Sequence, residues 1–258
     1  MKLKSKLLLA LLATSSAAFA QTAPAAPEVT YNVGVVSQYR YRGLAQTKGQ
    51  PALQGGVDYA NANGYYLGAW ASQIKWIEDS SNNPSGVNYS GKTELDLYGG
   101  YKFKSSGIDY DVGFLRYQYV GNNLGKSTVY SNANTNEVYA AATSGAYTLK
   151  WSYSLSTLFG TPSSRGSDYI DFSANYDMGN GITLTPHIGR QLVNGPGAGS
   201  GGLSYSDGSL TVAKDLGNGL SATVAAIVTN AKSSAFNSNS TSYATGKSAV
   251  VVGLKYGF

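Results

Sequence analysis

The stretch ELDLYGGYKF, residues 94–103, alternates between polar and apolar side chains. One face of an extended chain would carry Leu95, Leu97, Gly99, Tyr101 and Phe103, and the other Glu94, Asp96, Tyr98 and Lys102. The two faces alternate at every second residue, which is the period of an extended strand. The stretch therefore predicts a β-strand with one apolar face and one polar, charged face.

Similar alternation recurs along the chain and predicts an all-β protein of one domain. The expected strands cover residues 29–41, 51–60, 65–74, 93–103, 108–119, 135–144, 147–155, 170–176, 182–191, 203–215, 220–229 and 249–258. Within 108–119 the apolar parity changes after Phe114, which predicts a β-bulge near Gly113. The change leaves the face of Arg116 unassigned.

The connections between these strands alternate in length. The pairs Asn63-Gly64, Asn180-Gly181 and Asn218-Gly219 predict tight hairpins, because both residue types tolerate the positive φ of a type I′ turn. Turns near 61–64, 104–107, 144–146, 178–181 and 216–219 are short, whereas loops near 42–50, 75–92, 120–134, 157–167, 193–202 and 231–246 are mostly longer. Five short and six long connections fit twelve strands with both termini at the short-turn end.

Three features favour a transmembrane antiparallel up-and-down β-barrel of about 12 strands over a soluble sandwich. Aromatic rings, which prefer the lipid–water boundary, occur near expected strand ends at Tyr31, Tyr59, Tyr65, Phe103, Tyr110, Tyr147, Tyr176 and Tyr256. The opposite face is polar with many small residues, as a wet interior would be. The chain ends on the aromatic Phe258, a frequent feature of chains handed to the outer-membrane insertion machinery. A sheet that faces lipid must also close, since open edges would leave unpaired backbone groups in hydrocarbon.

The N-terminus reads as a secretory signal peptide over residues 1–20. Lys2, Lys4 and Lys6 precede a short apolar run, and Ala18-Phe19-Ala20 forms a cleavage site. We expect a mature chain from residue 21, with a short periplasmic segment over 21–28 and the outer-membrane barrel over 29–258. The expected location is the bacterial outer membrane, with both termini periplasmic.

Composition limits the other possibilities. The chain has 19 basic and 14 acidic residues, a net charge of +5, and loss of three signal lysines leaves 16 against 14, or +2. No contiguous basic patch indicates a nucleic-acid partner. The chain has no cysteine, which excludes disulfides and Cys-based catalysis. No apolar run in the mature chain approaches the roughly 18 residues of a transmembrane helix.

Residues 37–72 carry a family resemblance. The segments SQYRYRG at 37–43, Gln46, PALQGGVDY at 51–59 and GYYLGAWAS at 64–72 are similar to the TorF family of small proteobacterial outer-membrane barrels of porin type. The segments ELDLYGGY at 94–101 and DYDVG at 109–113 extend the resemblance, whereas the second half fits more loosely. The resemblance implies a small porin-type barrel and no assigned active site.

The parity of the strands places a set of charged residues inside the barrel. The candidate pore-lining residues are Arg40, Arg42, Asp58, Glu94, Asp96, Lys102, Lys150 and Asp171. These charges could set ion or solute selectivity, or they could mainly pair with one another as a plug. About eight strands give a filled interior and 16–18 an open channel, so side-chain size decides for twelve. The loop 43–50 that follows Arg40 and Arg42 could also fold inward.

Catalysis and cofactor binding are not expected. His187 is the only histidine, and its same-face neighbour Gly189 cannot serve as a nucleophile, so we interpret His187 as a lumen-wall residue. No His/Asp/Glu cluster has metal-ligand spacing, and no glycine-rich loop suggests a nucleotide. The sequence therefore predicts a non-enzymatic channel for small polar solutes or ions whose main partner is the lipid bilayer. Two alternatives are a non-conducting surface receptor or adhesion protein that acts through its long loops, and a soluble exported binding protein.

Overall fold

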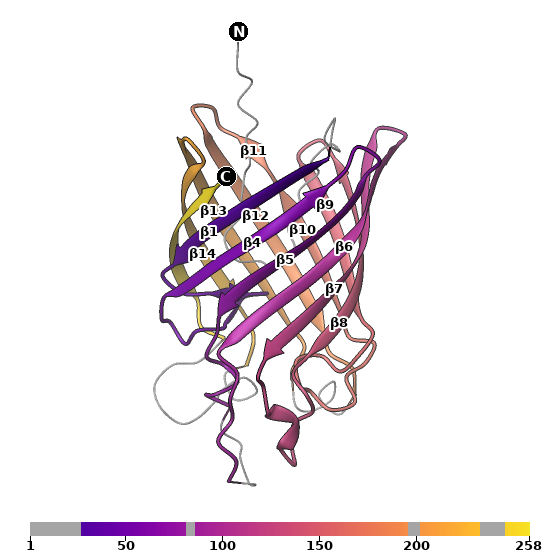
Figure 1. Cartoon of the computed structure of the whole chain (residues 1–258), viewed down its shortest axis with the longest axis vertical. Coiled ribbons are helices and arrows are strands. Elements are labelled where there is room, and N and C mark those ends of the chain that lie inside the picture. Colours follow the sequence, from indigo (N-terminus) through magenta and orange to yellow (C-terminus); the bar gives the residue numbers. More distant parts are fainter. Residues whose placement is uncertain (1–26, 81–85, 196–201, 233–245) are drawn as a thin grey trace.

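Twelve antiparallel strands close into an up-and-down barrel in the computed structural model (Figure 1). The structure describes residues 27–80, 86–195, 202–232 and 246–258, so the predicted signal peptide lies outside it. The barrel strands are β1 Glu28–Val36, β4 Ala52–Ala60, β5 Tyr65–Gln73, β6 Thr93–Ser105, β7 Ile108–Val120, β8 Thr135–Ser144, β9 Tyr147–Ser154, β10 Asp168–Ala174 with its continuation β11 Tyr176–Asp177, β12 Ile182–Leu192, β13 Tyr205–Gly217, β14 Leu220–Thr229 and β15 Ala249–Gly257. Two short strands, β2 Arg40–Tyr41 and β3 Leu44–Ala45, and a 3₁₀ turn at Leu124–Lys126 lie in the loops.

Each barrel strand pairs with its neighbours in sequence, and β1 pairs with β15 to close the sheet, with Val33 opposite Tyr256. Closure satisfies the backbone groups that an open edge would expose. No helix in the described segments is long and apolar enough to cross a membrane.

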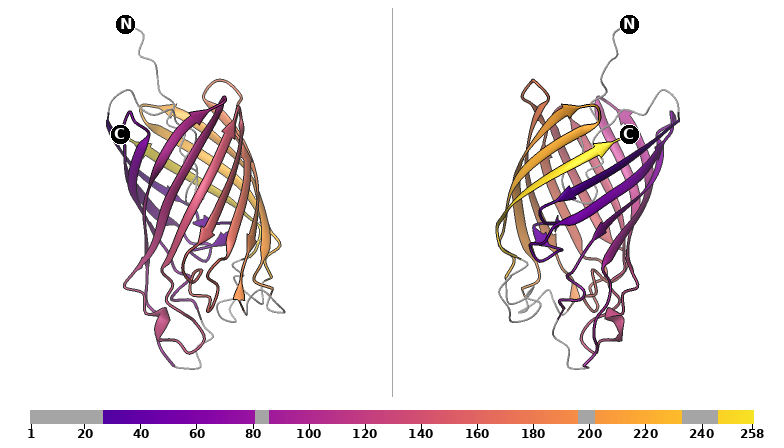
Figure 2. Two further views of the ribbon diagram at one scale, coloured as in Figure 1. Left: turned by 90° about the vertical axis from the view of Figure 1, so that its right-hand side faces the viewer. Right: turned by 60° about the vertical axis from the view of Figure 1, so that its left-hand side comes forward.

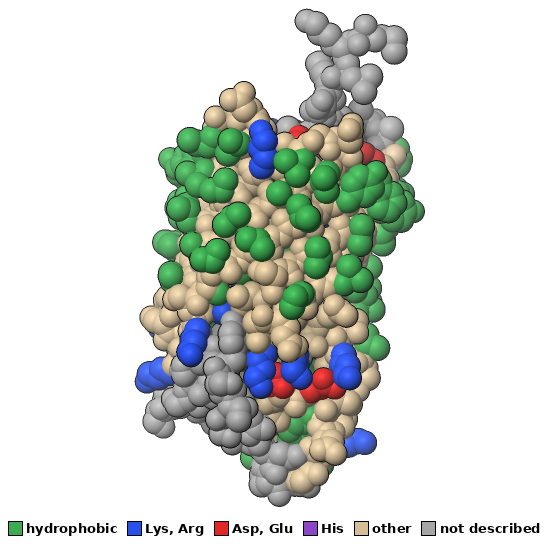
Figure 3. Space-filling view, turned by 90° about the vertical axis from the view of Figure 1, so that its left-hand side faces the viewer, with side chains coloured by type: hydrophobic (Ala, Val, Ile, Leu, Met, Phe, Trp, Pro, Cys, Tyr) green, Lys and Arg blue, Asp and Glu red, His purple; other side chains and the backbone are tan. Residues whose placement is uncertain are grey.

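The outer face of the barrel is apolar. On β1, Val29, Tyr31, Val33 and Val35 are 43–50% exposed, while the residues between them turn inward. Figure 3 shows apolar side chains spread over the strand region of one side. A continuous exposed apolar surface of this kind is stable against lipid and not against water. The predicted fold class is therefore confirmed, and the alternation on each strand is its cause.

The two ends of the barrel differ as predicted. Short turns lie at one end and longer loops at the other (Figure 2). Phe258 lies at the turn end, where its N–H donates to the Tyr31 carbonyl. Asn180 and Asn218 both have positive φ, 52° and 53°, as type I′ turns require. At Asn63-Gly64 only the glycine has positive φ, because the Asn61 side chain accepts from the Asn63 and Tyr65 amides.

The first strand ends earlier than predicted. The sequence indicated a strand over 29–41, but β1 stops at Val36 and the chain turns into the lumen. The alternating sequence pattern continues past Val36, but Arg40 and Tyr41 belong to a separate strand, which pairs with Leu44 and Ala45.

The predicted bulge near Gly113 is absent. The register of β7 runs without a shift on both sides, with Gly113 opposite Gly100 on β6 and Tyr139 on β8. The parity changes because Leu115, Tyr117 and Tyr119 are apolar or aromatic residues on the inner face. Arg116 consequently faces outward. Gly113 has a packing role, since a Cβ there would lie 2.5 Å from the Tyr139 ring.

We therefore expect Gly113→Ala to destabilise the barrel by about 1–3 kcal/mol, because the Tyr139 ring must leave its position to make room. The measurement is the free energy of unfolding in urea for the protein folded in lipid vesicles. Gly208→Ala is the control, because a Cβ at that position meets nothing nearer than the His187 carbonyl oxygen at 3.3 Å. An equal cost at the two glycines would contradict the packing role.

Candidate functional site

A hairpin from the first loop enters the lumen. We call residues 38–46 the inner hairpin; it contains β2 and β3, with Tyr41 paired to Leu44. Its two-residue turn consists of Arg42, at φ 44°, and Gly43, at φ 76°. Positive φ at both central residues is the type I′ geometry, which is uncommon for an arginine. A Cβ at Gly43 would lie 2.6 Å from Asp207 Cβ, so only glycine fits where the turn approaches β13.

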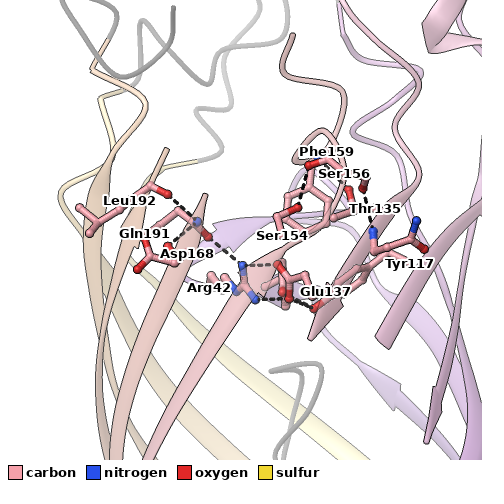
Figure 4. Close-up of polar contacts among 12 residues, drawn as sticks. Arg42, Tyr117, Thr135, Glu137, Ser154, Ser156, Phe159, Asp168, Gln191 and Leu192 are labelled. Atoms are coloured by element: carbon pink, nitrogen blue, oxygen red, sulfur yellow. Dashed lines mark hydrogen bonds and ion pairs between the residues drawn. The ribbon is translucent and has the colours of Figure 1, made fainter. Parts of the chain in front are cut away.

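The tip of the inner hairpin carries a buried ion pair (Figure 4). Arg42 Nη1 and Nη2 donate to the two Glu137 carboxylate oxygens at 3.0 and 2.7 Å, and Nη1 also donates to Gln191 Oε1 at 2.8 Å. The guanidinium lies 4.4 Å from the centre of the Tyr169 ring. Both charged side chains are at most 5% exposed. A bidentate, desolvated pair of this kind holds the hairpin against β8 and β12, across the barrel from β1.

Two tyrosines of the inner hairpin extend this network to β6 and β7. Tyr39 donates to Glu94 Oε1 at 2.7 Å, and the Tyr41 and Tyr117 hydroxyls are 2.6 Å apart. Tyr117 in turn donates to Glu137 at 3.1 Å. The hairpin therefore contacts opposite walls of the barrel through side chains that have partners.

Arg40 stabilises the base of the inner hairpin. Its Nε donates to Gln38 at 2.9 Å, and Nη1 donates to the Gly43 carbonyl at 3.1 Å and to the Lys247 carbonyl at 2.6 Å. Arg40 is 1% exposed, and these three acceptors are two backbone carbonyl oxygens and a side-chain amide oxygen. This set ties the first loop to the last one.

The structure places the six other predicted residues on the inner face of strands. Glu94 and Asp96 lie on β6 beside the inner hairpin, 1% and 2% exposed. Asp58 accepts from the Tyr98 hydroxyl. Lys102 and Lys150 lie over the rings of Tyr66 and Tyr139, at 5.0 and 4.1 Å from the ring centres, and Asp171 contacts His187. That these residues line a conducting path stays a prediction.

His187 lies on the inner wall of β12. Its Nε2 is 2.7 Å from an Asp171 oxygen and 3.2 Å from the Tyr169 hydroxyl. Tyr169 also donates to Asp207 at 3.0 Å. Gly189, the same-face neighbour, accommodates the Tyr169 ring, since a Cβ there would lie 1.9 Å from the hydroxyl. The glycine that weighed against catalysis in the sequence is therefore a packing feature.

Sequence reasoning did not select the groups that hold the inner hairpin. Glu137 and Gln191 are the partners of Arg42, and Asp207 lies beside Gly43. Glu137 and Asp207 lie on strands whose alternation is weak, at 135–144 and 203–215. Each has inward parity relative to the exposed residues on its strand, and this parity is the signal that could have identified them.

Exposure differs along the lumen. At the level of the inner hairpin, Tyr39, Tyr117 and Glu137 are at most 2% exposed. Nearer the turn end, Asp58, Lys102 and Lys150 remain half-buried. The inner hairpin thus narrows the loop half of the lumen. On the turn side of the hairpin, these three charged side chains stay partly accessible to solvent.

Comparisons with known proteins are consistent with the geometry. A family model described as "Bacterial protein of unknown function (Gcw_chp)" matches residues 20–258. No functionally curated protein matches the chain in sequence. The NanC porin superposes with a TM-score of 0.51 at 8% identity, covering 90% of this chain and 99% of that one. The KdgM porin superposes with a TM-score of 0.50 at 8% identity, covering 89% of this chain and 98% of that one. At such low identity these similarities show a shared porin-like barrel fold.

Proposed function

Since this chain belongs to the Gcw_chp family, described as bacterial proteins of unknown function, we propose from its own geometry that it is an outer-membrane channel for passive diffusion of small polar solutes or ions. The proposal includes the location, with the turn end and both termini periplasmic and the long loops outside. The resemblance of residues 37–113 to the TorF family supports the same function. Within this proposal the protein acts as a passive channel, without catalysis and without a cofactor.

One observation carries this proposal: a closed barrel with an apolar exterior has twelve charged side chains on its inner face, and a loop that folds inward narrows the lumen. A purely structural barrel could fill its interior with apolar or small residues. A lumen with charged walls and a constriction is how porins combine passage with selectivity. The inner hairpin is positioned to act as that constriction.

The charges on the inner face give the expected preference. Five basic residues, Arg40, Arg42, Lys102, Lys150 and Lys255, lie there with seven acidic ones, Asp58, Glu94, Asp96, Asp111, Glu137, Asp171 and Asp207. The interior therefore has a net charge of −2 with histidine neutral. Acidic excess along a narrow path lowers the energy of cations relative to anions, so a modest cation preference is expected.

The proposal is tested by adding the folded mature chain to planar lipid bilayers and recording current. Discrete conductance steps support a channel. If the protein inserts, as judged by heat-dependent gel mobility, but never conducts, the channel proposal is wrong and a non-conducting barrel remains.

That alternative is a non-conducting barrel that acts as a surface receptor or adhesion protein through its loops. The near-zero exposure of side chains around the inner hairpin favours it, because a fully packed constriction would pass nothing. A channel requires that the inner hairpin leave a path beside it or move, and the bilayer recording distinguishes these cases.

Replacing Arg40 and Arg42 with glutamine should make the channel more cation-selective. Two positive charges leave the constriction, and the interior changes from five basic against seven acidic residues to three against seven. The measurement is the reversal potential under a KCl gradient. Lys214→Gln is the control, because Lys214 lies on the outward face of β13 at the turn end. An unchanged reversal potential in the double variant would place the inner hairpin outside the ion path.

A further inference from the structure

The charges of the chain separate into three zones that the sequence does not reveal. Apart from the signal lysines, every charged residue lies in a described segment. The lumen holds a net charge of −2, and the turn end holds another −2, with Lys104 and Lys214 against Glu28, Asp109, Asp177 and Asp215. The remaining charges lie at the loop end, which is strongly basic.

We call the basic residues of the loop end the collar. Its nine members are Lys48, Lys75, Lys92, Arg116, Lys126, Arg165, Arg190, Lys232 and Lys247. Three acidic residues, Glu78, Asp79 and Asp168, accompany them, which gives the loop end a net charge of +6. Figure 3 shows Lys and Arg side chains gathered beside the loops, along one edge of the apolar outer face. The collar residues come from loops and strands spread along the chain, from Lys48 to Lys247, so the sequence shows no contiguous basic patch.

Two arginines of the collar project outward from strands, near the loop end of the apolar exterior. Arg190 on β12 is exposed and lies between Ile188 and Leu192, which are 65% and 39% exposed on the same outward face. Its Nη1 donates to Ser206 Oγ at 3.1 Å. Arg116 on β7 lies two residues from Phe114, which is 42% exposed, and donates to polar side chains of β7 and β8. Each arginine therefore places a guanidinium group beside an exposed apolar surface that a lipid acyl chain can contact.

We propose that the collar binds phosphate-bearing lipid headgroups of the leaflet that surrounds the loop end, with Arg116 and Arg190 as direct ligands. A lipid whose chains lie against Ile188 or Phe114, each on the turn side of its neighbouring arginine, places its headgroup at the level of these guanidinium groups. Arginine presents a planar fork of donors that matches phosphate oxygens, and the surrounding +6 field attracts them. The net negative turn end has no such complementarity. The apolar side chains beside the two arginines favour a lipid over a soluble anion, because a soluble anion has no hydrocarbon part to bury against them.

This inference rests on the proposed membrane location but not on conduction, so a barrel that never conducts leaves it standing. The test uses the mature barrel folded in a zwitterionic detergent. Native mass spectrometry measures the binding of lipid A, which carries two phosphates, and of the same lipid after removal of its phosphates. We expect the phosphate-bearing form to bind roughly tenfold more tightly or better, as charge-assisted hydrogen bonds imply.

The double variant Arg116→Gln/Arg190→Gln should lose most of that difference, while Lys214→Gln at the turn end should retain it. Heat-dependent gel mobility reports whether each variant folds, and the single variant Arg190→Gln replaces the double variant if that one does not. Equal binding of the two lipid forms would overturn the proposal. So would an equal loss in Lys214→Gln, or displacement of the lipid by millimolar inorganic phosphate.

Discussion

Replacement of Arg42 with methionine is expected to destabilise the barrel by about 3–5 kcal/mol, because it leaves the Glu137 carboxylate buried without its cation. Methionine keeps much of the side-chain volume and removes the charge and the donors. The inner hairpin also loses its bonds to β8 and β12, so it should leave the constriction more often. We expect a lower free energy of unfolding in lipid vesicles and a larger or noisier single-channel conductance.

The control for this prediction is the double variant Arg42→Met/Glu137→Leu. Replacing both members of a buried ion pair with apolar residues of similar volume is often neutral, so this variant should recover most of the stability. If the ion pair sets the width of the constriction, the conductance of this double variant should differ from that of the wild type. If side-chain packing sets it, the conductance should return to the wild-type value. An Arg42→Met variant with wild-type stability and wild-type conductance would show that the inner hairpin is held in place by other contacts.

Replacement of Val33 with lysine should cost about 2–4 kcal/mol, whereas lysine at the adjacent Asn32 should cost far less. Val33 is near the middle of β1, is 43% exposed and points outward, so its lysine would face the hydrocarbon of the bilayer. Asn32 points into the polar lumen, where water and acidic groups can solvate the ammonium.

The pair is measured as free energies of unfolding in vesicles of a neutral lipid, with refolding yield recorded for each variant. The two substitutions add the same side chain at consecutive positions, so their difference isolates the direction in which each residue points. Similar costs at both positions, or a soluble Val33→Lys protein that folds without lipid, would contradict the lipid-facing exterior.

Much of the barrel could be predicted because its determinants are local. Alternation at residues 94–103 sets the two faces of β6, and Asn218-Gly219 forms the tight turn between β13 and β14. Closure then follows from the apolar exterior, since a sheet with open edges is not stable in lipid. Three local inferences were wrong: the type I′ geometry at Asn63-Gly64, where the Asn61 side chain shapes the turn, the length of the first strand and the bulge near Gly113. The last two errors arise where the inner hairpin packs against the inner face of the barrel, so that inward residues there are aromatic or apolar and not polar.

The amino-acid sequence alone specified the strands, the alternating turns and loops and the outward direction of the apolar side chains, because each depends on neighbours within a few residues. Tertiary structure alone decided that residues 38–46 enter the lumen, that Arg42 pairs with Glu137, 95 positions away, and that nine scattered basic residues share one end of the barrel. These features depend on which wall lies opposite which loop once the sheet has closed, and no short-range pattern carries that information.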